Sequence, residues 1–213
     1  MPCWVKALFT PEWLTAIGTV GAVIVALILA IWGEEIKATF VRPKLSAKAG
    51  VGRPYSEKAR QTWLKIANPP NAYYFRIAVQ NRGNAAAYEV QVFLEQIDQV
   101  TSQGTKTVSD YVPMNLKWAY RNSATLPTLL PHMPPVFCNV VHVTEPRSDA
   151  LVLNVEFPSS GTHLLETGTY HFHIMVAAAN ARPRRYKLEI VFYGKWFEEE
   201  EKMFDNGFKM RVV

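Results

Sequence analysis

Cysteine is scarce in this chain, with Cys3 and Cys138 as the two examples among 213 residues. Two thiols are too few for a disulfide scaffold or for a zinc site with four cysteine ligands. The sequence also lacks a Walker-type loop, a Gly-x-Ser-x-Gly motif and a paired-glycine nucleotide fingerprint. Cys138 lies in an apolar run, where we expect an inert buried thiol. We therefore expect no catalytic residue, no cofactor and no small-molecule substrate.

Histidines are few, and their spacing argues against a metal site. His171 and His173 stand two residues apart on an expected strand, so both lie on one face, but two ligands do not complete a site. His132, His142 and His163 have no spacing that brings them to the same place. We expect His171 and His173 to be solvated strand residues without a metal.

The net charge of +5 is confined to one short segment. Residues 34–65 hold eight Lys and Arg against three Glu, whereas residues 66–213 hold fourteen residues of each sign. A nucleic-acid site needs basic residues spread over a folded face, so nucleic acid is not an expected partner. The apolar fraction of 49% and charged fraction of 19% exclude wholesale disorder and suit one domain with an appendage.

A long apolar run is present near the N-terminus. Residues 13–33 carry no charge and would form about 31 Å of helix, close to the ~30 Å hydrocarbon thickness of a bilayer. Trp13 and Trp32 bracket the run at positions suited to the headgroup level. The alternatives are a buried helix of a soluble domain and a cleaved signal peptide. Against a signal peptide, the run is longer than the usual apolar region of 7–15 residues, and no convincing cleavage site follows it. We predict a retained transmembrane helix over 13–33 after a short flank at 1–12.

Basic residues follow this run, whereas Lys6 alone precedes it. The five that follow within twenty residues are Lys37, Arg42, Lys44, Lys48 and Arg53. The positive flank of a span tends to stay cytoplasmic, so we expect the C-terminal part of the chain to face the cytosol. We also expect these five residues to contact lipid headgroups, at roughly 1 kcal/mol each near an anionic surface. The alternative is that they only fix the topology.

Small residues recur every four positions inside the run. They are Gly18, Ala22, Ala26 and Ala30. This spacing places them on one helix stripe, where two backbones can approach closely. The stripe predicts a self-associating helix and a homo-oligomer, and the alternative is the ordinary abundance of Gly and Ala in membrane helices.

Short alternating runs fill the rest of the chain. Strands are expected at 44–49, 73–80, 87–97, 136–143, 151–157, 169–177, 185–193 and 208–212, with further candidates at 62–66 and 114–120. In the third of these, Tyr88, Val90, Val92 and Leu94 share one face; in the sixth, Tyr170, Phe172, Ile174 and Val176 point inward. Four prolines between 127 and 135 indicate a loop or a sheet-edge crossing. The period of two without helical interludes predicts an all-β, antiparallel β-sandwich over 66–213, preceded by a basic segment at 34–65 that leads into the first strands.

One stretch within 75–97 has a longer pattern, V-x-N-x-G-x-x-x-A-x-x-V-x-V. Its residues are Val79, Asn81, Gly83, Ala87, Val90 and Val92. The pattern resembles the adhesion-related, immunoglobulin-like (CARDB-type) repeats of bacteria. The resemblance implies an immunoglobulin-like sandwich with a binding or spacing role and no catalytic residues. We expect Asn81 and Gly83 to supply the positive φ of a tight turn and Ala87 to permit a close strand contact.

An acidic run lies near the C-terminus. It consists of Glu198, Glu199, Glu200 and Glu201, and three arginines precede it: Arg182, Arg184 and Arg185. The simplest interpretation is a solvated charge run. The alternative is that the two groups pair, within one chain or between neighbouring chains.

These features favour a non-catalytic, membrane-anchored interaction or assembly module at the cytoplasmic membrane face, whose partner is another protein or further copies of itself. One alternative is an oligomerising membrane effector, of the bacterial or phage defence or toxin type, whose β domain senses a trigger. Another is an envelope-facing adhesion or assembly factor in the opposite orientation.

Overall fold

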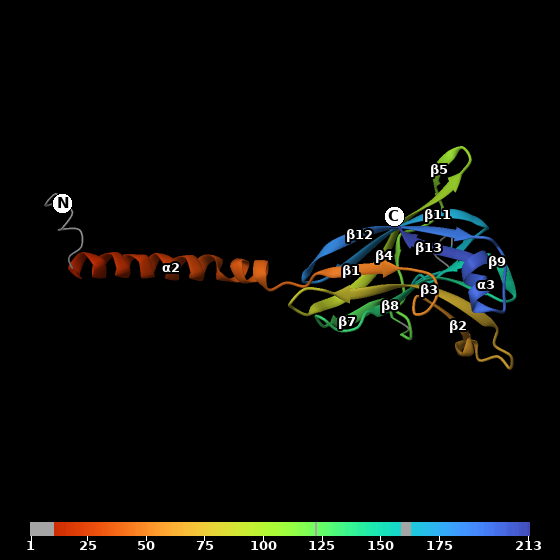
Figure 1. The fold of residues 1–213 in the computed structure, drawn as a ribbon, viewed down its shortest axis with the longest axis horizontal. Helices are drawn as coiled ribbons and strands as arrows, with labels where there is room; N and C mark the ends of the chain where they lie inside the picture. Colours follow the sequence, from red (N-terminus) through yellow and green to blue (C-terminus); the bar gives the residue numbers. More distant parts are fainter. Residues whose placement is uncertain (1–10, 122, 159–162) are drawn as a thin grey trace. The chain divides into compact units, whose positions relative to one another are not determined.

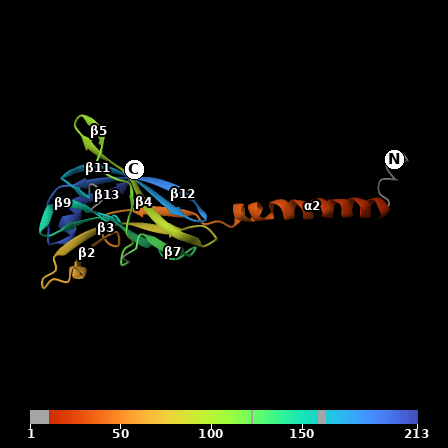
Figure 2. The same cartoon turned by 180° about the vertical axis from the view of Figure 1, so that it is seen from behind.

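The computed structural model describes residues 11–121, 123–158 and 163–213, and the chain divides into two compact units, Met1–Arg42 and Pro43–Val213. The first unit holds a single helix over its described residues, and the second is built from β-strands (Figure 1; Figure 2 from behind). The β unit begins at Pro43, so it includes part of the basic segment that was assigned to 34–65.

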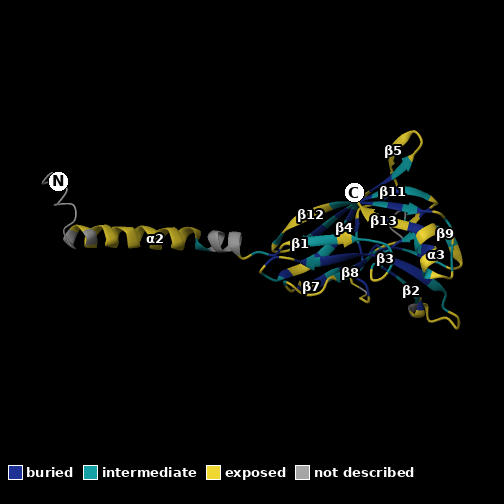
Figure 3. Ribbon diagram, viewed as in Figure 1, coloured by how far each residue is buried: buried dark blue, intermediate teal, exposed yellow. Residues whose placement is uncertain are grey.

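Helix α2 (Pro11–Phe40) is continuous and starts at a proline, which suits the first helical turn because that position needs no N–H partner. Its segment Thr15–Gly33 is long and apolar enough to span a membrane, with a mean hydropathy of 2.4. None of this segment is buried, and apolar side chains such as Ile17 and Leu29 are more than half exposed (Figure 3). Because no polar stripe divides its surface, the helix suits an apolar surrounding on every side. The helix also continues seven residues past Gly33.

The strands of the second unit form two antiparallel sheets. The first has the order β1-β3-β8-β9-β10 with β2 also on β3, and comprises β1 (Leu45–Ala49), β2 (Ser56–Arg60), β3 (Asn71–Asn81), β8 (Val136–Thr144), β9 (Arg147–Leu153) and β10 (Leu164–Leu165). The second has the order β13-β12-β11-β4-β5 with β6 and β7 also on β4, and comprises β4 (Ala87–Thr101), β5 (Gly104–Thr107), β6 (Met114–Asn115), β7 (Thr125–Leu129), β11 (Gly168–Ala178), β12 (Ala181–Phe192) and β13 (Phe208–Val212). A 3-10 turn, η1 (Thr62–Leu64), and a short helix, α3 (Glu200–Asn206), complete the unit.

One hydrophobic core joins the inner faces of both sheets, so the fold is β-sandwich-like. Phe75 and Ile77 of β3 belong to this core together with Phe172 and Ile174 of β11, and all four are fully buried. The expected inward alternation of β11 is therefore confirmed. Trp118 is also fully buried, and its indole N–H donates to the carbonyl of Ala124 at 3.1 Å, which satisfies its polar atom.

The start of β4 departs from the expected alternation. Tyr88 does not share the buried face of Val90, because its side chain is 51% exposed while Ala87 is buried. Glu89, which lies between Tyr88 and Val90, has φ 52, while the register between β4 and β7 is the same before and after it. The left-handed backbone at Glu89 therefore breaks the alternation without an inserted residue, and both Tyr88 and Glu89 are exposed.

Other expected boundaries shift locally. Residues 62–66 form the turn η1 and its exit rather than a strand, and β9 starts and ends earlier than the expected 151–157. The proline-rich stretch contributes β7, which includes Pro127 but pairs only with β4, so the missing N–H falls on a sheet edge. Beyond the expected strand 87–97, β4 continues to Thr101 and forms a hairpin with β5.

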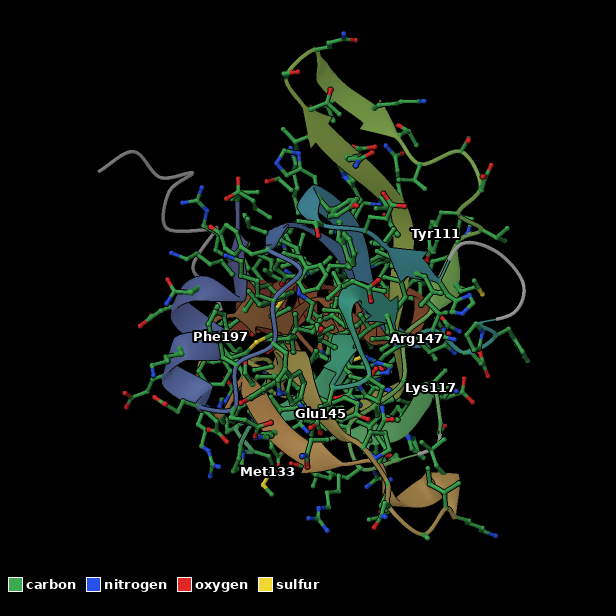
Figure 4. The ribbon with its side chains drawn as sticks, turned by 90° about the vertical axis from the view of Figure 1, so that its right-hand side faces the viewer. Tyr111, Lys117, Met133, Glu145, Arg147 and Phe197 are labelled. Carbon is green, nitrogen blue, oxygen red and sulfur yellow. The ribbon has the colours of Figure 1, made fainter. Side chains whose placement is uncertain are left out.

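The two ends of the β unit differ in what they carry. β3 is eleven residues long, which corresponds to about 36 Å. At one end, which we call the entry end, the chain enters from residue 42; this end comprises residues 43–45, 81–88, 128–133 and 178–184. The opposite, far end carries η1, α3 and the hairpin β4–β5, which projects from the sheet (Figures 1 and 4).

Candidate interaction surfaces

Asn81 organises the entry end. Its side-chain oxygen accepts hydrogen bonds from the backbone N–H groups of Lys44 (3.1 Å) and Gly83 (3.0 Å). Its amide group donates to the carbonyls of Ala85 (2.7 Å) and Leu129 (3.0 Å). Asn81 is fully buried, so these four bonds replace contacts that water would otherwise supply. Three separate segments of the chain are thereby joined at one side chain.

The expected role of Asn81 and Gly83 in backbone geometry is wrong. Neither residue is among the positive-φ positions of the described chain. The turn is held by the Asn81 side chain, which bonds to the backbone two and four residues ahead, in the manner of an Asx turn. Ala87, by contrast, is fully buried, as its expected close strand contact requires.

A second asparagine fixes the hairpin between β11 and β12 to the same end. The side-chain oxygen of Asn180 accepts from the backbone N–H of Tyr88 at 3.0 Å, and its amide donates to the carbonyl of Ala86 at 2.8 Å. The N–H of Ala179 also donates to the carbonyl of Tyr88 at 2.9 Å. The hairpin that carries the arginines is therefore attached to the loop that follows β3.

Exposed basic side chains gather at this end. They are Lys44, Arg82, Arg182 and Arg184. None of the four takes part in an ion pair between described residues, whereas Arg185 is bound to Glu95 at 2.9 Å. Three large apolar side chains at the same end are about half exposed: Tyr88, Leu130 and Met133. The entry end thus combines unpaired positive charge with accessible apolar surface.

The acidic run is paired differently from the alternative raised by the sequence. Glu200 accepts two hydrogen bonds from Arg53, Glu198 pairs with Lys58, and Glu199 pairs with Lys202. The reason lies in the topology: β12 carries the arginines at its start and runs about 40 Å before the acidic run follows. Arg182, Arg184 and Arg185 therefore lie at the entry end and the acidic run at the far end. Pairing between neighbouring chains stays a prediction.

Aromatic contacts fasten the segment around α3 to the first sheet. The ring of Tyr73 lies 4.8 Å from that of Trp196, and the ammonium of Lys58 lies 5.7 Å from both ring centroids. The Tyr73 hydroxyl donates to the carbonyls of Phe197 and Glu198, and Figure 4 shows Phe197 beside α3. Burial, together with the nearby acidic charges, raises the pKa of Tyr73 to about 12. These contacts hold the segment before α3 against β3.

The basic residues expected at lipid headgroups do not all lie together. Lys44 is at the entry end and Lys48 is exposed further along β1. Arg53 follows β1 and is engaged by Glu200 of α3, away from the entry end. Arg42 is half-buried just before the β unit. The side chain of Lys37, and both Lys6 and Cys3, lie outside the described residues.

A buried charge cluster covers the outer face of the first sheet. Arg76 is 5% exposed; its guanidinium donates to Asn139 at 3.0 Å, to Glu57, and to the hydroxyl of Tyr120 at 2.9 Å. Tyr120 adopts φ 60 and also donates to Glu57. Burial raises the pKa of Glu57, but these hydrogen bonds and the Arg76 charge outweigh burial and place it below its usual value. The alternating pattern of β3 gave no signal for this cluster, because its partners come from distant segments.

The paired histidines are more enclosed than expected. His173 Nε2 lies 2.8 Å from Asp98, and Asp98 also accepts from Gln96 and Thr107. The side chain of His171 is 17% exposed and faces Glu189 at 3.8 Å. They lie on one face, as predicted, and each faces an acidic residue; His171 is largely enclosed, whereas the side chain of His173 is 37% exposed. Among the described residues no group of three or more His, Cys, Asp or Glu is placed to hold a metal ion.

Two further titratable groups are held neutral by burial. Burial lowers the pKa of His142 to about 4, against a smaller opposite effect from Asn154, and its ring stacks on Tyr74 at 5.2 Å. Cys138 is fully buried as expected; burial raises the pKa of its thiol, which donates to the carbonyl of Lys117 at 3.4 Å. Both residues serve as packed components of the first sheet.

Comparison of the chain with protein-family models, with curated proteins and with solved structures gave no match. The surfaces described above therefore carry the functional argument by themselves.

Proposed function

We propose that this chain is a single-pass membrane protein whose β unit is a non-catalytic interaction or assembly module of immunoglobulin-like type. The observation that carries the proposal is α2: a span of membrane length whose apolar side chains find no partner within the described chain. An unpartnered apolar helix of this size is stable in lipid and costly to expose to water.

The orientation follows from the charges next to the span. Arg42, Lys44 and Lys48 follow it closely and favour a cytoplasmic β unit. A β unit with its own hydrophobic core, joined to the span by few residues, suits the presentation of a binding surface close to the membrane.

Membrane extraction and a reporter test this function. The full chain is expected to stay with vesicles in alkaline carbonate, to keep its N-terminal residues, and to show cytosolic activity of a reporter fused after Val213. Release into the supernatant, or a mature N-terminus beyond residue 33, would refute the anchor; a periplasmic or extracellular reporter would favour the envelope-facing alternative.

Self-association of α2 is a second candidate function, with the β unit as a sensor. It is supported by Gly18 and Ala22, which stand on one face of a continuous helix. A Cβ added at Gly18 meets no atom within 4 Å, so the chain's own packing does not require glycine there. G18L/A22L is expected to reduce the mass of the detergent-solubilised assembly, whereas A16L/V20L on the opposite face leaves it unchanged. Equal masses for all three proteins would refute it.

A further inference from the structure

We propose that the entry end of the β unit is a binding surface for the anionic lipid headgroups of the membrane that α2 crosses. The inference rests on the proposed function, because it requires α2 to span. The sequence predicted headgroup contacts from one basic segment, whereas the entry end is formed by four segments that are distant in the sequence.

Chain length restricts how far the entry end can lie from the bilayer. Beyond Gly33, the helix continues for seven residues, or about 10 Å. Residues 41–44 can add at most about 14 Å before β1 starts at Leu45. Leu45, where β1 begins at the entry end, is therefore within about 25 Å of the hydrocarbon edge in any orientation of the β unit. The far end can lie about 36 Å further away, the length of β3.

The charge of the entry end is complementary to an anionic surface. Lys44 and Arg82 are adjacent, since the N–H of Arg82 donates to the carbonyl of Lys44 at 2.8 Å. Arg182 and Arg184 come from the hairpin that Asn180 attaches to the same loop. Two acidic residues lie nearby on β4: Glu95 is already bound by Arg185, and Glu89 is exposed. A net positive end within a Debye length of about 10 Å attracts anionic headgroups.

Apolar side chains at the same end suit the interfacial region of a bilayer. Tyr88, Leu130 and Met133 are 51%, 52% and 51% exposed. An amphipathic tyrosine prefers the headgroup level, and exposed aliphatic side chains gain from partial burial beneath it. The left-handed backbone of Glu89 accompanies the outward position of Tyr88, so a local irregularity of β4 serves the surface. An acidic protein could match the charge, but the short connection to α2 favours lipid as the occupant.

Headgroup proximity of the full chain tests the inference. The C3S chain, reconstituted in nanodiscs, carries a fluorophore at T128C (entry end) or S102C (far end), and the quencher is a headgroup-spin-labelled lipid. Cys138 is fully buried and does not compete for the label. We expect quenching at T128C to be about threefold stronger with about 30% phosphatidylglycerol than with phosphatidylcholine alone, and to weaken at about 0.5 M salt. The S102C label is expected to change little.

Charge reversal supplies the matched comparison. The entry-end variant is K44E/R82E/R182E/R184E, and the control is R60E/K106E/R147E/K209E, which reverses four exposed basic residues elsewhere. The first is expected to lose the dependence on anionic lipid and the second to keep it. Equal behaviour of the two variants, or quenching indifferent to phosphatidylglycerol, overturns the inference even if the chain stays in the nanodisc. Failure to enter the nanodisc overturns the spanning helix instead, so the two failures are distinguishable.

Discussion

Substitution of Asn81 by alanine removes the junction that holds the entry end together. Its side chain makes four hydrogen bonds to backbone groups on three segments and has no exposed surface. Each such bond contributes about 0.5–1.5 kcal/mol net, and buried backbone groups left without partners cost at least as much. We therefore expect N81A to lower the free energy of unfolding by about 4 kcal/mol.

Urea unfolding of the full chain in mild detergent, followed by tryptophan fluorescence, measures this loss. With a slope of about 2 kcal/mol per molar, the midpoint should fall by about 2 M. The matched control is N180A, which makes the same chemical change at an exposed asparagine with two side-chain bonds and should cost about 1 kcal/mol.

A glycine at position 81 distinguishes two roles of Asn81, one through the hydrogen bonds of its side chain and one through its backbone conformation. If Asn81 served to permit a positive φ, N81G would be tolerated or stabilising. Since the turn depends on the side chain, N81G should cost at least as much as N81A. The reasoning is refuted if N81G approaches the wild type, or if N81A costs no more than N180A.

Three further predictions concern titration and backbone strain. The folded protein lowers the pKa of His142 from 6.5 to about 4, so the buried neutral ring contributes stability above pH 6.5 that is lost as the pH falls towards 4. The loss is about 3 kcal/mol, and in H142Q the urea midpoint should change less with pH over that range. Burial raises the pKa of Asp98, but hydrogen bonds, including one from His173, outweigh burial and lower the pKa. The ionised Asp98 therefore contributes stability above its ordinary pKa, and this stability is lost at lower pH. The urea midpoint of D98N should fall less on acidification than that of the wild type, and an equal fall would count against the cluster. A Cβ at Gly194, whose φ is 64, would lie 2.4 Å from Thr167 Oγ1, so G194A should cost about 2 kcal/mol in thermal or urea unfolding. The measured cost should exceed that of G104A, where φ is 120 but nothing lies within 4 Å of the added atom.

Local pattern was sufficient to predict the elements whose own backbone is regular. The apolar helix needs only length and composition, and β11 needs only the alternation from Tyr170 to Val176, which it keeps although its register with β4 shifts between His173 and Ile174. The start of β4 could not be predicted in the same way. The positive φ of Glu89 changes which side chains face the core, and a glutamate gives no signal in the sequence for that backbone conformation.

The polar clusters could not be predicted from the alternation of residues along a strand, for a related reason. Arg76 looks like an ordinary outward residue of an alternating strand, yet it is buried because Glu57 and Tyr120 cover it. Its partners are 19 and 44 residues away in sequence. Periodicity records which face a side chain takes, whereas the groups that cover this face are set by tertiary packing.

The entry end shows how folding redistributes charge that looks local in the sequence. Counting residues concentrates the excess in 34–65, but Arg53 of that segment is drawn to Glu200 at the far end, where its charge is offset. Arg182 and Arg184 belong to a region of balanced charge, yet the hairpin between β11 and β12 brings them to the entry end, where Lys44 also lies. A region whose sequence has balanced charge can therefore contribute to a positively charged surface, and under the proposed function the short connection to α2 determines which surface lies nearest the membrane.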